Sequence, residues 1–202
     1  MQALERRHGD RAVSFARSVI EERVGGGDGE PPTVVDGALA ADRGAFVTLA
    51  VDGSLRGCIG RPYPTQPAHR AIRESAVGAA VGDPRFRPVS PDELATVTVE
   101  VSLLSDPEPV SRPAESVDVG RHGLIVDADE RRGLLLPQVA ADREWETTRF
   151  LAETCRKAGL DGDCWRGEDV GVERFTASVY AEREPRGPIV PVALGESAMA
   201  RS

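Results

Sequence analysis

Cysteine is scarce in this sequence, which contains only Cys58, Cys155 and Cys164. They form no Cys-x-x-Cys pair, and three thiols cannot all be paired within one chain. Neither a zinc site nor a disulfide framework is therefore indicated. We expect three reduced thiols and no metal centre.

Long apolar runs are also absent. No stretch approaches the roughly 20 apolar residues needed to span a bilayer, and the first residues lack the basic-then-apolar order of a signal peptide. We expect a cytoplasmic protein that does not insert into a membrane. Glycine and proline cluster at 25–32, where we expect a flexible connection after a first helix.

Aromatic residues make up only 4% of the chain, and the formal net charge is −8. A nucleic-acid or anionic membrane partner requires a basic surface, and RNA binding on a sheet requires stacking aromatics beside basic residues. We therefore expect neither partner. Lysine occurs once, as Lys157, among 25 basic residues. This composition fits a halophilic host, although a GC-rich genome would give the same arginine bias.

Common catalytic signatures are missing as well. The sequence has no GxGxxG after a strand, no Walker loop, no HExxH and no GxSxG. Nucleotide binding, zinc proteolysis and serine hydrolysis therefore lack the groups that perform them. We expect no cofactor.

Functional groups are most concentrated at 55–60, where the segment Leu-Arg-Gly-Cys-Ile-Gly contains a guanidinium, a thiol and two glycines. Asp52-Gly53 precedes it and predicts a tight type I′ turn between strands 46–51 and 55–60. Because side chains alternate along a strand, Arg56 and Cys58 should share one face, about 6 to 7 Å apart at their Cα atoms.

Periodicity predicts the remaining elements. Apolar spacing indicates a helix capped by Asp10 that runs to residue 24, a second helix at 68–80, and a third at 147–158 that ends at Gly159. Ser90 and Glu93 have the spacing of a capping box. The clearest strand is 96–104, with four aliphatic residues on one face and Glu100 in the middle of the other.

Five segments of the sequence are distinctive: 55–60 (LRGCIG), 83–86 (DPRF), 100–105 (EVSLLS), 133–139 (GLLLPQV) and 185–188 (PRGP). Together they identify the chain as similar to the AMMECR-one domain family, in an archaeal member, and the resemblance covers nearly the whole sequence. It implies a compact α+β fold with an antiparallel-rich sheet, packed helices and two intimately associated subdomains, over residues 1–188. Residues 189–202 are expected to form a flexible tail. The resemblance also implies companions of Memo type and radical-SAM type, but no known reaction.

Cys58 is the leading candidate for catalysis, because a nearby arginine stabilises a thiolate and lowers its pKa. The alternative is a small buried strand residue with no reactivity. His122, between glycines, is a candidate base for Cys58. Glu100 is another candidate base, with Arg56 as a clamp for an anionic group.

Two hypotheses about function remain. In the first, the protein is an enzyme or ligand-binding protein that acts on a small anionic metabolite in a cleft around the LRGCIG strand. The cleft would be lined by the four candidates above and by Gln138. In the second, the protein is a non-catalytic adaptor that uses the same cleft for a partner protein. The sequence does not determine an oligomeric state.

Overall fold

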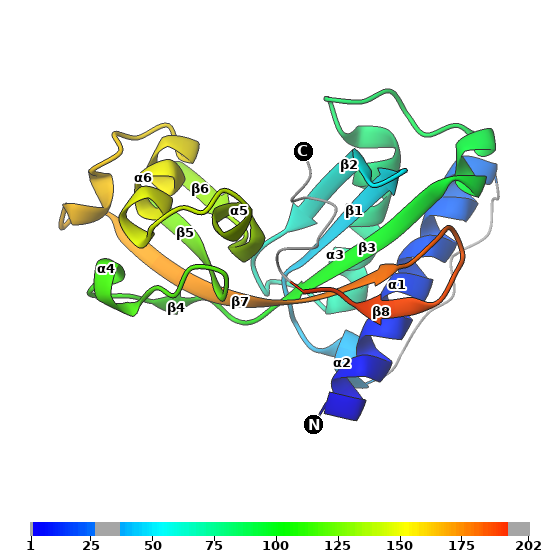
Figure 1. Cartoon of the computed structure of the whole chain (residues 1–202), viewed down its shortest axis with the longest axis horizontal. Helices are drawn as coiled ribbons and strands as arrows, with labels where there is room; N and C mark the ends of the chain where they lie inside the picture. Colours follow the sequence, from blue (N-terminus) through cyan, green and yellow to red (C-terminus); the bar gives the residue numbers. More distant parts are fainter. Residues whose placement is uncertain (1, 27–36, 194–202) are drawn as a thin grey trace. The chain divides into compact units, whose positions relative to one another are not determined.

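The structure is a computed structural model that describes residues 2–26 and 37–193 (Figure 1). The chain divides into two compact units. Unit 1 comprises Met1–Leu104 and Ser178–Ser202, and unit 2 comprises Ser105–Ala177. Strand β7 (Gly171–Glu182) begins in unit 2 and ends in unit 1. The prediction of an α+β protein with an antiparallel-rich sheet is confirmed. Across the described ranges, no helix has the length and apolar character to cross a membrane.

Unit 1 is built on a sheet in which β2 forms the edge, followed by β1, β3 and the C-terminal part of β7, with β8 also paired to β7. Its strands are β1 (Ala45–Val51), β2 (Ser54–Arg61), β3 (Val97–Leu104), β7 and β8 (Ile189–Pro191). Its helical elements are α1 (Gln2–Gly25), α2 (Gly37–Ala40), α3 (Ala68–Val77), the π-helical turn η1 (Gly78–Gly82) and the 3-10 turn η2 (Pro91–Ala95).

Helices α1 and α3 form the hydrophobic core of unit 1 together with β1 and β3. The predicted apolar stripe of α1 is buried, including Phe15, Val19 and Ile20. The predicted N-cap at Asp10 is wrong, because α1 already begins at Gln2. The residues before Asp10 include Gln, Ala, Leu, Glu and Arg, which are good helix formers and extend the helix in the N-terminal direction.

The sheet of unit 1 has two chemically different faces. On one face, the predicted alternation of β3 is confirmed, since Val97, Val99, Val101 and Leu103 are all buried in the core. We call the opposite side the polar face. It includes Phe46, Thr48, Ala50, Cys58, Thr98, Glu100 and Ser102.

Unit 2 contains a smaller antiparallel sheet. Its elements are β4 (Glu108–Pro109), α4 (Pro113–Ser116), β5 (His122–Ala128), β6 (Arg131–Leu135), α5 (Pro137–Asp142), α6 (Thr147–Lys157), the 3-10 turn η3 (Cys164–Arg166) and the first part of β7. Strand β5 pairs with both β6 and β7. Its Leu124 and Val126 pack with Phe150 and Leu151 of α6 in a separate core.

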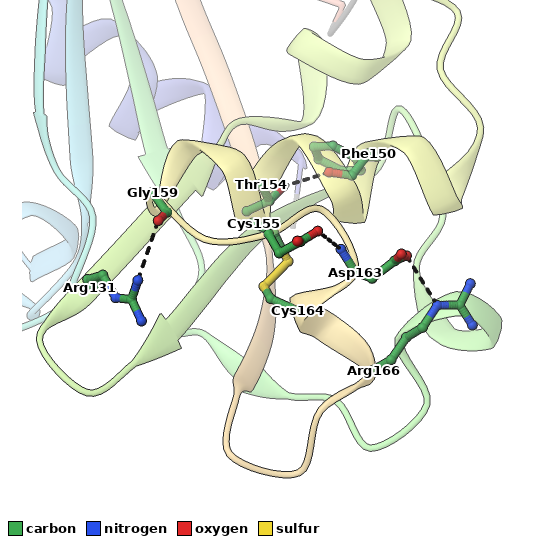
Figure 2. Close-up of a disulfide and its surroundings, with 9 residues drawn as sticks. Arg131, Phe150, Thr154, Cys155, Gly159, Asp163, Cys164 and Arg166 are labelled. Atoms are coloured by element: carbon green, nitrogen blue, oxygen red, sulfur yellow. Dashed lines mark hydrogen bonds and ion pairs between the residues drawn. A yellow bond between two sulfur atoms is a disulfide. The ribbon is translucent and has the colours of Figure 1, made fainter.

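The expectation of three reduced thiols is wrong for two of them. Cys155 in α6 and Cys164 in η3 form a disulfide, drawn in yellow in Figure 2. The chain reverses after α6 at Gly159, whose φ is 73°, and the Leu160 N–H donates to the Cys155 carbonyl. This turn returns the chain to the helix, so two cysteines nine residues apart meet. Cys58 is the free cysteine.

Two expectations fall partly outside the described residues. The connection predicted at 25–32 extends beyond Gly26, after which residues 27–36 are not described. The tail predicted from residue 189 begins with an ordered segment, because Ile189–Pro191 forms β8 and pairs with β7. Residues 194–202 are also outside the described part.

Candidate functional site

The LRGCIG segment forms β2, and its two glycines allow close packing. A Cβ atom at Gly57 would collide with the carbonyl oxygen of Ala79, and one at Gly60 would collide with the ring of Phe46. Glycine at 57 therefore allows η1 to approach this strand, and glycine at 60 leaves room for the Phe46 ring. The turn before it has positive φ at both Asp52 (50°) and Gly53 (76°), as a type I′ turn requires.

Arg56 occupies a β-bulge that the sequence does not reveal. Gly57 lies opposite Leu49, and Leu55 lies opposite Ala50, so Arg56 has no opposite residue on β1. A bulge of this kind redirects a side chain. The Cys58 thiol and the Arg56 guanidinium therefore have different partners. Strict alternation along the strand predicted instead that they lie side by side on one face.

The Arg56 guanidinium is held by the segment that leads into η2. Its Nε and Nη2 atoms donate to the two carboxylate oxygens of Glu93, at 2.8 and 3.0 Å, and Nη1 donates to the Arg87 carbonyl at 2.9 Å. The side chain is 12% exposed. Glu93 also accepts the Ser90 N–H in the predicted capping box, and Arg56 holds the pKa of Glu93 at about 2. Because this guanidinium already binds a carboxylate, the geometry favours a structural role over an anion clamp.

Cys58 is buried, with 8% of its surface exposed. The Thr48 hydroxyl donates to its Sγ atom at 3.4 Å. Burial raises the pKa of the Cys58 thiol to about 11, against the smaller lowering effects of Thr48 and Arg85. The thiol is therefore protonated at neutral pH, and the arginine that lowers its pKa is Arg85. This environment favours the unreactive alternative for Cys58 over an activated nucleophile.

The side chains of Asp83 and Arg85 cover the outer edge of β2 at Cys58. Asp83 Oδ2 accepts the Cys58 N–H at 2.9 Å, and Arg85 Nη2 donates to the Cys58 carbonyl at 3.3 Å. Asp83 and Arg85 also pair with each other at 2.7 Å, and this contact holds the pKa of Asp83 at about 2. Together they satisfy the groups that a neighbouring strand would otherwise bind. The sequence places both in the DPRF motif, but gives no signal that this motif contacts Cys58.

A row of polar side chains crosses the sheet from this point. Thr48 on β1 lies directly opposite Cys58 on β2 and directly opposite Glu100 on β3. Glu100 is only 4% exposed, and its negative charge contributes to the raised pKa of Cys58. Ser102 follows on the same face with 1% exposure, and its Oγ has no partner in the described ranges. The predicted position of Glu100 on the polar face is therefore observed, but it is buried.

A cavity of about 820 Å³ opens on the polar face of unit 1. Its floor includes Thr48, Ala50, Thr98 and Glu100, and its rim includes the Asp52-Gly53 turn. The remaining wall comes from the end of η2 and from the segment that joins β7 to β8. The ionisable lining residues are Asp52, Glu100, Glu182, Arg183 and Glu184. Among the described residues, no group of three or more His, Cys, Asp or Glu side chains is placed to hold a metal ion.

Glu182 at the cavity wall is part of a buried ion pair. Its carboxylate accepts from the Nε of Arg17 in α1 at 2.9 Å, and from the Val99 N–H at 3.0 Å. Arg17 Nη2 also donates to the Val97 carbonyl at 2.7 Å. These bonds fix the end of β7 against β3 and α1, and they neutralise the charge of Glu182.

His122 and Gln138 belong to unit 2, whereas Cys58 and Glu100 belong to unit 1. His122 Nδ1 accepts the Asp118 N–H at 3.0 Å, so the neutral ring carries its proton on Nε2. Burial lowers the pKa of His122, with a further contribution from Arg174. Gln138 is fully buried in α5, and neither atom of its amide has a partner among the described residues. Their roles in a common site with Cys58 remain predictions.

Comparison with known proteins gives consistent matches. A family model described as AMMECR1 matches residues 13–180. A protein of Thermococcus gammatolerans is 47% identical over 191 residues, which cover 90% of this chain and 93% of the relative. A protein of Pyrococcus furiosus is 46% identical over 191 residues, covering 90% and 91% of the two chains. The crystal structure of uncharacterized protein PH0010 from Pyrococcus horikoshii matches with a TM-score of 0.83 and 43% identity, covering 92% of this chain and 96% of that one. None of these names states an activity.

Proposed function

Because the chain belongs to the AMMECR1 family, and the names of its relatives state no activity, we propose a function from the geometry of unit 1. The protein binds a small molecule in the cavity on the polar face, which is lined by β1, the strand that pairs with the LRGCIG strand. The observation that carries this proposal is the size of the cavity together with its buried polar floor. Small-molecule sites usually have volumes of about 300 to 1,000 Å³ and a few well-placed polar groups.

The floor is held rigidly by the sheet. Thr48 and Thr98 lie on neighbouring strands, and the backbone pairing of β1 with β3 fixes their positions relative to Glu100. Ala50 leaves space between these polar groups, and Val190 and Val192 provide apolar contact surface on the wall. A site built on paired strands needs little rearrangement when a ligand binds, which reduces the entropic cost of binding.

In this proposal Cys58 supports the site without reacting. Its Sγ atom accepts the hydrogen of Thr48, which fixes the orientation of that hydroxyl at the cavity floor. Asp83 and Arg85 hold the backbone of Cys58 from the other side. Glu100 is the ligand-contacting candidate, while Arg56 stabilises the segment that ends in η2.

A cavity-filling variant tests the proposal. The full chain is screened by thermal shift against a panel of amino acids, amines, sugars, nucleosides and dicarboxylates, because a ligand of the native state raises its melting temperature. Ala50→Phe places a large side chain on the floor, and Ala114→Phe makes the same change at an exposed position in unit 2. We expect a stabilising compound for the wild type and for Ala114→Phe, and none for a folded Ala50→Phe.

Two results would overturn the proposal. One is a panel in which no compound stabilises the wild type, and the other is a compound that stabilises Ala50→Phe equally. Circular dichroism establishes that Ala50→Phe is folded, and the smaller Ala50→Leu is used if it is not. A protein that binds no compound but co-purifies with Memo-type or radical-SAM companions would instead support the adaptor hypothesis.

A further inference from the structure

The Cys155–Cys164 disulfide joins α6 to a short segment of unit 2 that contains η3 (Figure 2). We call residues 161–170 the η3 segment, and β7 begins directly after it. Its residues Cys164, Trp165 and Val170 are partly buried and pack against the hydrophobic core of unit 2. The η3 segment therefore covers part of this core with a small number of apolar side chains.

The polar contacts of the η3 segment are local. The Cys164 N–H donates to the Asp161 carbonyl at 3.0 Å, and the Arg166 N–H donates to the Asp163 carbonyl at 3.1 Å. The side chains of Arg166 and Asp163 also pair with each other, at 3.5 Å. Within the described part of the chain, residues 161–167 have no hydrogen bond or ion pair to another element. The disulfide and the apolar contacts thus hold the segment against α6.

The two cysteines of this disulfide differ in exposure. Cys155 is fully buried on α6, whereas Cys164 is half-buried in a turn whose neighbouring residues Asp163 and Arg166 are exposed. Thiol–disulfide exchange begins when a thiolate attacks one of the two sulfur atoms, and access decides which sulfur is attacked. A reductant in solution can therefore reach Cys164 before it reaches Cys155.

The core of unit 2 can also accommodate the reduced form. Cys155 packs with Phe150 and Leu151 in the hydrophobic core. A neutral thiol behaves as a small hydrophobic side chain and is common in protein interiors. Helix α6 therefore keeps its packing when the sulfur–sulfur bond is broken, whereas the η3 segment loses its covalent link to the helix.

From this arrangement we propose that Cys155–Cys164 is a reversible redox site, and that its reduction releases the η3 segment from α6. A thiolate of a dithiol reductant attacks Cys164 Sγ, the sulfur–sulfur bond breaks, and Cys155 leaves as a thiolate that takes up a proton. The second thiolate of the reductant then attacks the reductant sulfur of the mixed disulfide, and Cys164 leaves and is protonated. The protein gains two electrons and two protons, and the dithiol is oxidised to a disulfide.

This redox site goes beyond the proposed function, because it lies in unit 2 and does not involve the cavity of unit 1. The chemical partner is a dithiol in the reducing direction and a disulfide in the oxidising direction. The change that it controls is local, from a covered to an uncovered apolar surface beside α6.

The rate of reduction in the native state tests whether the disulfide is accessible. The oxidised full chain is incubated with dithiothreitol, and samples are quenched in acid, unfolded and alkylated with N-ethylmaleimide. Mass spectrometry then gives the reduced fraction at Cys155 and Cys164, and the free Cys58 serves as the fully labelled reference. We expect native reduction to be less than about a hundredfold slower than reduction in concentrated urea. A larger difference would overturn the proposal, because reduction would then require unfolding.

Amide hydrogen exchange tests the release of the segment. Reduction should accelerate exchange in the η3 segment by about tenfold or more, at times when β5 remains protected in both forms. Oxidised glutathione should then restore the slow exchange. Unchanged exchange in the η3 segment after complete reduction would contradict the release. Loss of protection throughout unit 2 would also overturn it, because the disulfide would then be a requirement for folding.

A matched pair of variants assigns the effect to this disulfide. Cys164→Ser should show fast exchange in the η3 segment without reductant, and no further change when reductant is added. Cys58→Ser makes the same change at the free cysteine and should retain the full response to reductant. Slow exchange in Cys164→Ser, equal to that of the oxidised wild type, would overturn the proposal. If Cys164→Ser does not fold, the reduced wild type provides the same comparison.

Discussion

The carboxylate of Asp83 accepts a hydrogen bond of 2.9 Å from the backbone N–H of Cys58. These residues lie in the DPRF and LRGCIG motifs, which are separated by more than twenty residues in the sequence. The contact joins the two motifs within unit 1. Asp83 and Arg85 cover the edge of β2, which pairs with β1, and β1 contributes Thr48 and Ala50 to the proposed binding cavity.

Replacing Asp83 with Asn should destabilise the protein by about 2 kcal/mol at neutral pH. This is the free energy that corresponds to a pKa lowered from 3.8 to about 2 in the folded state. Because the pKa is lowered in the folded state, this stability is present above the ordinary pKa and is lost as pH falls through about 2. Urea unfolding between neutral and acidic pH measures it. Asp169→Asn, at an exposed position, is the control. Equal stabilities of Asp83→Asn and the wild type at neutral pH would contradict the prediction.

Arg56→Lys should lower stability by about 1 to 2 kcal/mol, since an ammonium group cannot reproduce the two parallel bonds to Glu93. Arg112→Lys affects an exposed pair with Glu115 and should cost little. Chemical denaturation compares the two variants. Affinity for a cavity ligand should not change in Arg56→Lys, and a large loss of affinity at retained stability would restore the anion-clamp hypothesis.

Cys58 should alkylate slowly at neutral pH. Its thiol has a pKa of about 11 and is buried, so the reactive thiolate is rare and poorly accessible. The rate of iodoacetamide modification, followed by mass spectrometry, should rise with pH well beyond 9 without a plateau near neutrality. A plateau below the ordinary cysteine pKa would support the nucleophile hypothesis.

Loss of the Cys155–Cys164 disulfide should destabilise the protein by about 2 to 3 kcal/mol in the chain-entropy account of a short closed loop. Melting temperature with and without a reductant gives this difference. Cys164→Ser should resemble the reduced wild type and should not respond further to reductant. A wild type that is indifferent to reductant would argue against this contribution.

Local sequence rules predicted much of unit 1. The Asp52-Gly53 turn was recognisable because both residues tolerate positive φ, and the alternation of β3 followed from its pattern of valines. The capping box at Ser90 and Glu93 also followed from spacing, and it is present. These features depend on residues that are close together in the sequence, so a local sequence pattern predicts them.

The features that were missed depend on distant contacts. The bulge at Arg56 is a property of the pairing of two strands, and no residue in the sequence marks it. The contact between Asp83 and Cys58 requires the chain to return through α3 and η1. The disulfide was missed because its cysteines fit no common spacing, and the turn at Gly159 brings them together.

An NMR titration of the full chain with a compound from the thermal-shift panel tests the central claim most directly, because it locates a ligand as well as detecting it. Backbone N–H signals of Thr48, Thr98 and Glu100 should shift together and saturate, and a folded Ala50→Phe should show no such response. Saturable shifts confined to residues away from the polar face, or no shifts at all, would contradict the assignment of this cavity as a small-molecule site.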